Sequence, residues 1–200
     1  MCEQNNVKAE VSQVAATADP APLGLGGFAL TTFVLSMSNA KILEGHAFLG
    51  LAFFYGGLAQ LLAGMQEYKK NNVFGATAFS TYGAFWLSVA LMTLLTLLEP
   101  YGVSVKWGGP LTGIFLIGFT IFNTYMWIGS FRVNVAVCTV FTTLEITFIL
   151  LDLAEFGLIS SVPGGIMGII TAFAAWYASA AGILNTVYGR TVLPVGPLNK

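Results

Sequence analysis

The chain has 200 residues, of which 56% are hydrophobic and 8% are charged, and its eight basic and nine acidic side chains give a formal net charge of −1. A soluble protein carries about 25% charged residues on average, so this chain lacks the charge to cover a water-exposed surface. The composition excludes an ordinary soluble enzyme, a nucleic-acid-binding protein and a disordered chain. It indicates that membrane lipid surrounds most of the molecule.

Six apolar stretches have about the length that a helix needs to cross a hydrocarbon core roughly 30 Å thick. In chain order they run over residues 24–40, 47–66, 75–98, 109–130, 134–154 and 163–186. Pro110 and Pro163 stand at the beginning of the fourth and sixth stretches, where a helix tolerates proline. The runs are continuous rather than alternating, which argues against barrel strands. We therefore predict an all-α integral membrane protein, a compact bundle of six transmembrane helices.

This count of spans sets the expected organisation of the chain. We expect a polar N-terminal tail over residues 1–18, a six-helix transmembrane domain over 19–190 and a short C-terminal tail over 191–200. Residues 1–22 contain no continuous apolar stretch, so we also expect no cleavable signal peptide.

The distribution of basic residues predicts the orientation of the bundle. With six spans both termini lie on one side, and only Lys41 and Lys106 fall on the other side. The side of the termini carries the other six basic residues, Lys8, Lys69, Lys70, Arg132, Arg190 and Lys200. By the positive-inside rule, both termini face the cytoplasm of a multi-pass protein in the cytoplasmic membrane. Glu67, Lys69 and Lys70 are expected to be helix-end anchors at that edge.

Each span carries polar or small residues at three- and four-residue steps, so these residues share one face of their helix. The polar candidates for lining a solute path are Thr32, Asn39, Gln60, Thr93 and Glu145. Such side chains also bond membrane helices to one another, but a stripe on all six helices favours a polar path. Lys and Arg are absent at membrane depth, and conduction needs weak binding. A weak acid or a neutral solute therefore fits the residues.

Glu145 is the one charged residue near the middle of a predicted span. A charge at that depth is costly, so such a residue usually faces the bundle interior and takes part in function. Two interpretations stay open: Glu145 carries a proton, or it makes a structural contact with a neighbouring helix or subunit.

The residue types that catalysis and metal binding need are scarce. Cys2 and Cys138 cannot form a disulfide framework, and a single histidine, His46, excludes a multi-histidine metal site within one chain. The sequence contains neither an HExxH nor a GxSxG motif. We expect no enzyme activity, no metal and no cofactor.

Several sequence strings then point to one family. The segment Asp19-Pro20-Ala21-Pro22-Leu23-Gly24-Leu25 resembles the NPAPLGL signature of the acetate uptake transporter family, the succinate–acetate permeases and Gpr1/Fun34/YaaH proteins. The resemblance continues over essentially the whole chain from residue 19, in the strings YGGLAQLLAG at 55–64, EYKKNNVFGATAFSTYGAFW at 67–86 and GRTVLPVG at 189–196.

The sequence departs from the signature at one position, because the family's leading Asn is Asp19 here. Both side chains accept N–H bonds at a helix start, but Asp cannot donate an amide hydrogen.

The resemblance implies a homo-hexamer in which each protomer has its own path for small monocarboxylates, acetate above all and succinate as a second candidate. It also implies a hydrophobic constriction whose Phe, Tyr and Leu correspond to Phe28, Tyr82 and Leu144. Such a ring would exclude water, and the Tyr82 hydroxyl would donate a hydrogen bond to the carboxylate. If Leu144 faces the path, Glu145 flanks it or faces a neighbouring subunit, because adjacent helical residues point about 100° apart.

Three functions remain open at this point. The first is a carboxylate path, working as an anion channel or a proton symporter. The second is a path for ammonia or another small solute. The third is a membrane sensor or regulator that transports nothing.

Overall fold

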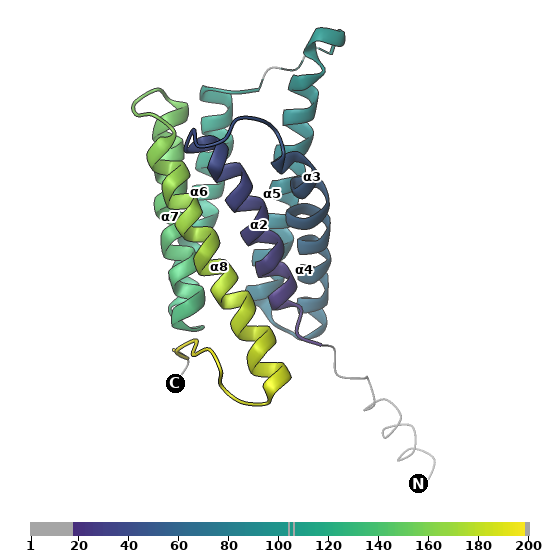
Figure 1. Cartoon of the computed structure of the whole chain (residues 1–200), viewed down its shortest axis with the longest axis vertical. Coiled ribbons are helices and arrows are strands. Elements are labelled where there is room, and N and C mark those ends of the chain that lie inside the picture. The colour runs from purple at the N-terminus through teal and green to yellow at the C-terminus, as the bar shows by residue number, and fades with distance from the viewer. Residues whose placement is uncertain (1–17, 104, 106, 199–200) are drawn as a thin grey trace, which may run out of the picture.

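The computed structural model describes residues 18–198 except 104 and 106, so Cys2, Lys8, Lys106 and Lys200 lie outside the described residues. Its elements are α2 (Ala21–Asn39), α3 (Phe48–Phe53), η1 (Phe54–Ala59), α4 (Gln60–Lys69), α5 (Val73–Leu97), η2 (Glu99–Tyr101), α6 (Pro110–Ser130), α7 (Val135–Glu155) and α8 (Val162–Tyr188). Together they form one helical bundle (Figure 1). Six helical segments are long and apolar enough to cross a membrane, with α3, η1 and α4 joined into one. The predicted all-α, six-span fold class is confirmed.

Short polar and cyclic residues define where the helices begin. Pro110 is the first residue of α6, where its missing N–H costs nothing. The Asn72 side chain accepts from the N–H of Gly75 at 3.2 Å, and the Asn134 side chain accepts from the N–H of Val137 at 2.8 Å. These two side chains cap α5 and α7, because each satisfies an N–H that has no partner within the helix.

The second span departs from the continuous α-helix that its apolar run predicts. Its centre, η1, is a wider π-helix that contains Gly56 and Gly57, a form that usually appears as a short insertion in an α-helix. At this point the backbone lies directly against α2: a Cβ added at Gly27 would come within 2.6 Å of the Tyr55 carbonyl oxygen. The π-helix therefore coincides with a close approach of two backbones, which the hydrophobic pattern does not encode.

Small residues let α8 lie along α2, as Figure 1 shows. A Cβ added at Gly165 would meet the backbone of Ala40 and Asn39 at the end of α2. Near the other end of the pair, the Ser179 hydroxyl donates to the Pro22 carbonyl at 2.7 Å. Close packing through small residues is how membrane helices gain contact area without a hydrophobic driving force.

The described part of the predicted C-terminal tail returns to the bundle. The N–H groups of Val135 and Ala136 at the start of α7 donate to the carbonyls of Gly196 and Val195, at 2.8 and 3.1 Å. These bonds hold the end of the described chain beside the start of α7, at the same end of the bundle as the start of α2 (Figure 1).

The outer face of α6 is apolar. Ile114, Ile121 and Ile128 recur every seven residues and are 66%, 63% and 58% exposed. Such a continuous exposed apolar stripe is unusual on a water-soluble monomer, and it is what a helix facing lipid or a neighbouring protomer requires.

Candidate functional site: a constricted path through the bundle

Two cavities open into the bundle from opposite ends. The first, of about 150 Å³, reaches Glu67, Asn72 and Asn134 at the end where the described chain begins and finishes. We call it the termini-side cavity. The second, of about 200 Å³, reaches Asn39 and Ser161 at the other end. We call it the far-side cavity.

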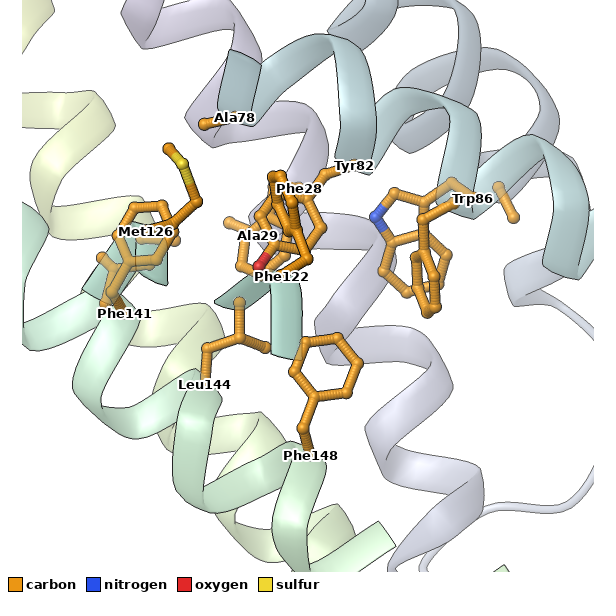
Figure 2. Packing of buried hydrophobic residues seen from close by; sticks show 14 of the residues in the cluster. Phe28, Ala29, Ala78, Tyr82, Trp86, Phe122, Met126, Phe141, Leu144 and Phe148 are labelled. Atoms are coloured by element: carbon orange, nitrogen blue, oxygen red, sulfur yellow. The ribbon is translucent and has the colours of Figure 1, made fainter. Parts of the chain in front are cut away.

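Three residues line both cavities: Phe28 from α2, Tyr82 from α5 and Leu144 from α7. They are 5%, 3% and 4% exposed, so all three are buried in the part of the bundle where the two cavities share their lining. The rings of Phe28 and Tyr82 meet edge to face with centroids 5.6 Å apart, and Leu144 extends toward them from α7 (Figure 2). We call these three residues the constriction. They are the residues that the family resemblance implies, and their role in transport stays a prediction.

The polar candidates separate into two groups and one outlier. Thr32, Asn39 and Thr93 line the far-side cavity, whereas Gln60 lines the termini-side cavity. Gln60 is 1% exposed, and its Oε1 atom has no hydrogen-bond partner among the described residues. Glu145 lines neither cavity.

The far-side cavity also contains donors that are unpartnered among the described residues, of which the sequence pointed to Thr32 but not to Trp86 or Thr112. The Trp86 indole N–H and the hydroxyls of Thr32 and Thr112 are buried there without a partner in the described part of the chain. The indole nitrogen lies on the side of Trp86 that faces Phe28 and Tyr82 (Figure 2). A buried donor without a partner is costly, so these groups are available to a polar solute. In the sequence Trp86 ends the family-like string at 67–86, but nothing there marks its indole N–H as a donor that faces a cavity.

Glu67 is not the exposed helix-end anchor that its position beside two lysines predicts. It is 0% exposed and lines the termini-side cavity. Its Oε2 atom accepts from the Asn72 amide at 2.8 Å, while Oε1 has no partner among the described residues. The cause is the tight turn between α4 and α5: Gly75 lies so close that a Cβ there would come within 2.8 Å of the Glu67 carboxyl carbon.

The residue that departs from the family signature makes two contacts. The Asp19 carboxylate accepts from the N–H of Ala21 at 3.1 Å and pairs with the Lys70 ammonium at 2.9 Å. The first contact is one that an Asn side chain also makes. The second is an ion pair, which Asn cannot form even where its Oδ1 accepts the same N–H bond, and it connects the signature to the loop after α4.

We expect Asp19→Asn to lower the melting temperature in detergent by less than about 3 °C, because an exposed ion pair contributes little. Asp19→Ala should lower it further, since it also removes the contact with the Ala21 N–H. Thermal unfolding of both variants measures the difference. Equal losses would show that the ion pair, rather than the N–H contact, carries the effect.

Glu145 lies behind the constriction, between α6 and α7. Its carboxylate accepts from Asn123 at 2.6 Å and from Thr124 at 2.7 Å, and it is 8% exposed. The Tyr82 hydroxyl, which was expected to bind a solute carboxylate, donates to Asn123 at 2.6 Å instead.

No group of three or more His, Cys, Asp or Glu side chains suited to a metal occurs within residues 18–198, positions 104 and 106 aside.

Comparison with known proteins identifies the family. Residues 2–200 match the model of the GPR1/FUN34/yaaH family. The chain belongs to this family. It is 37% identical over 183 residues to the succinate-acetate/proton symporter SatP of Escherichia coli K12, covering 90% of this chain and 95% of the relative. It is 40% identical over 202 residues to acetate permease A of Emericella nidulans, covering 89% of this chain and 65% of the relative.

Other members carry other names. Ammonia transport outward protein 2 of Saccharomyces cerevisiae is 41% identical over 173 residues, and the match covers 83% of this chain but only 61% of the yeast protein's length. Among solved structures, that of the bacterial acetate channel SatP superimposes with a TM-score of 0.84 at 36% identity, covering 90% of this chain and 99% of that one. The family's fold is therefore the fold of this chain, which is a multi-pass membrane protein.

Proposed function

We propose that the protein carries acetate and related small monocarboxylates, with succinate as a second candidate, across the cytoplasmic membrane. The observation that carries the proposal is that cavities from opposite ends of one protomer share Phe28, Tyr82 and Leu144. This arrangement supports a route interrupted by one apolar constriction. Relatives named as an acetate permease and a succinate-acetate/proton symporter support the choice of solute.

The lining of the route suits a small carboxylate that must be released quickly. No Lys or Arg is among the described residues that line either cavity, so a carboxylate is not trapped by a fixed cation. The unpartnered donors of Thr32, Trp86 and Thr112 can replace part of its hydration in the far-side cavity. At the constriction, Phe28 and Leu144 offer apolar surface to the methyl end.

Orientation and assembly belong to the same proposal. Lys69, Lys70 and Arg132 lie at the end of the termini-side cavity, so by the positive-inside rule we expect that cavity to face the cytoplasm. We expect a homo-hexamer in which every protomer has a complete route, since both cavities lie within a single chain.

The direct test is flux through purified protein in liposomes. We expect labelled acetate to move down its gradient faster than in protein-free liposomes, and excess unlabelled acetate to compete. An imposed pH gradient then separates a channel from a proton symporter. Liposomes that pass ammonia but not acetate would favour the second function, and inert liposomes would favour a sensor or regulator.

A further inference from the structure

A chain of side-chain hydrogen bonds connects the constriction to the interface between α6 and α7. The Tyr82 hydroxyl donates to Asn123 Oδ1 at 2.6 Å. Asn123 Nδ2 in turn donates to Glu145 Oε2 at 2.6 Å and to the Phe141 carbonyl oxygen at 3.2 Å. Asn123 is 0% exposed, so it exchanges none of these bonds with water.

The Phe141 carbonyl fixes which way the Asn123 amide points. A backbone carbonyl only accepts hydrogen bonds, so the NH2 group of Asn123 must face it, and the amide oxygen must then face Tyr82. The same NH2 group donates the hydrogen bond that Glu145 accepts. The Tyr82 hydroxyl therefore has one defined acceptor, the Asn123 amide oxygen, and the Phe141 carbonyl and the Glu145 carboxylate hold that amide in place.

Glu145 completes this arrangement from α7. Its Oε1 atom accepts from the Thr124 hydroxyl at 2.7 Å, so both carboxylate oxygens are bound by α6. Since Glu145 lines neither cavity, a solute in the route meets Tyr82 and not the carboxylate. Fully satisfied buried networks of this kind hold their members in one geometry.

We propose that Asn123 and Glu145 are positioning residues that hold the Tyr82 ring across the constriction, an inference that rests on the proposed transport function. We call the hydrogen bonds that join Tyr82, Asn123 and Glu145 the latch. The latch keeps the Tyr82 hydroxyl occupied while the ring packs edge to face on Phe28. A carboxylate that takes up this hydroxyl must displace Asn123, so release of the latch accompanies passage. Glu145 acts as a structural contact with a functional consequence rather than as a proton carrier.

The chain offers a matched control on the same pair of helices. The Trp127 indole N–H donates to the Thr142 hydroxyl at 2.7 Å, which also joins α6 to α7. Neither residue lines a cavity or contributes to the Tyr82 chain of hydrogen bonds. Thr142→Val therefore removes an interhelical hydrogen bond of similar length without touching the latch.

The first test is a double-mutant comparison of acetate flux in liposomes. We expect Asn123→Leu and Tyr82→Phe each to raise the initial rate about fivefold, the population shift that one ordinary hydrogen bond represents. The double variant should be no faster than Tyr82→Phe alone, because Asn123 acts only through the hydroxyl. Thr142→Val should leave the rate unchanged. Additive effects, or a rate in Asn123→Leu equal to wild type, would overturn the inference.

The second test separates positioning from proton carriage at Glu145. Gln at this position accepts from Asn123 and donates to Thr124, whose hydroxyl can turn to the Thr120 carbonyl 2.9 Å away. We expect Glu145→Gln to keep the wild-type rate and its pH dependence, and Glu145→Leu to behave like Asn123→Leu. Loss of pH dependence in Glu145→Gln would assign proton carriage to Glu145 and refute the latch.

A spectroscopic measurement keeps this inference separable from the proposed function. The C–O stretching band of Tyr82, isolated as the infrared difference between wild type and Tyr82→Phe, reports the hydrogen bond of that hydroxyl without any transport. It should shift in Asn123→Leu and in Glu145→Leu but not in Thr142→Val. If wild-type liposomes pass no acetate, the proposed function fails, and this shift alone decides whether Asn123 and Glu145 position Tyr82. An unshifted band refutes the positioning.

Discussion

Replacing Leu144 with Trp is expected to reduce acetate flux by more than about tenfold, which corresponds to about 1.4 kcal/mol added to the barrier. Leu144 is 4% exposed and lines both cavities, so an indole in its place extends into the space between Phe28 and Tyr82 where the two cavities share their lining. The initial rate of labelled acetate uptake in liposomes measures the effect. A larger apolar side chain at a hydrophobic constriction closes the route without adding charge.

Ile149 supplies the matched control on the same helix. It is 45% exposed and lines neither cavity, so Ile149→Trp adds the same indole to the outer surface of α7. This variant should keep the wild-type rate, and size-exclusion profiles should show that both variants remain folded. Wild-type flux through folded Leu144→Trp would mean that the solute does not pass between the two cavities.

The fold was predictable because membrane spans are set by length and apolarity, which are local properties of the sequence. The predicted stretch at 134–154, for example, corresponds to α7 at Val135–Glu155. The π-helix η1 was not predictable, because it depends on how closely the second span approaches Gly27 of α2. Hydrophobic patterns describe one helix at a time and contain no information on such contacts.

The candidate site, like the fold, was predictable from the sequence only in part. Phe28, Tyr82 and Leu144 came from the family resemblance, and the structure brings them together between the cavities. Helical geometry predicted that Leu144 and Glu145 cannot both face the route, and the structure leaves Glu145 outside both cavities. The partners of Glu145 were not predictable, since the bond to Asn123 depends on the relative rotation and height of α6 and α7.

Glu67 and Trp86 were missed for a related reason. Both line a cavity, and each has a polar atom without a partner among the described residues. In the sequence Glu67 is one of three charges at a helix end, and Trp86 is one of four tryptophans. Only the tertiary arrangement separates a buried polar atom that faces a cavity from an ordinary anchor or packing residue.

The packing of α8 on α2 predicts the largest loss of stability from the smallest substitution. We expect Gly165→Ala to lower the melting temperature in detergent by about 5–10 °C, since overpacking costs about 1–3 kcal/mol and each kcal/mol shifts a chain of this size by roughly 2–4 °C. The added methyl group would lie 2.7 Å from the Ala40 Cα atom and the Asn39 carbonyl carbon. Both neighbours are backbone atoms, so no side chain can rotate away, and the two helices must move apart.

Gly118 in α6 distinguishes this packing effect from the general consequence of replacing glycine in a helix. A Cβ there meets nothing within 4 Å, so Gly118→Ala should be neutral or slightly stabilising, because Ala favours a helix interior over Gly by about 1 kcal/mol. Opposite signs for the two substitutions would assign the loss to the α2–α8 contact. A Gly165→Ala variant that melts at the wild-type temperature would mean that the two helices do not approach as closely as the structure has them. Since Phe28 stands on α2, loosening this contact would also displace one side of the constriction.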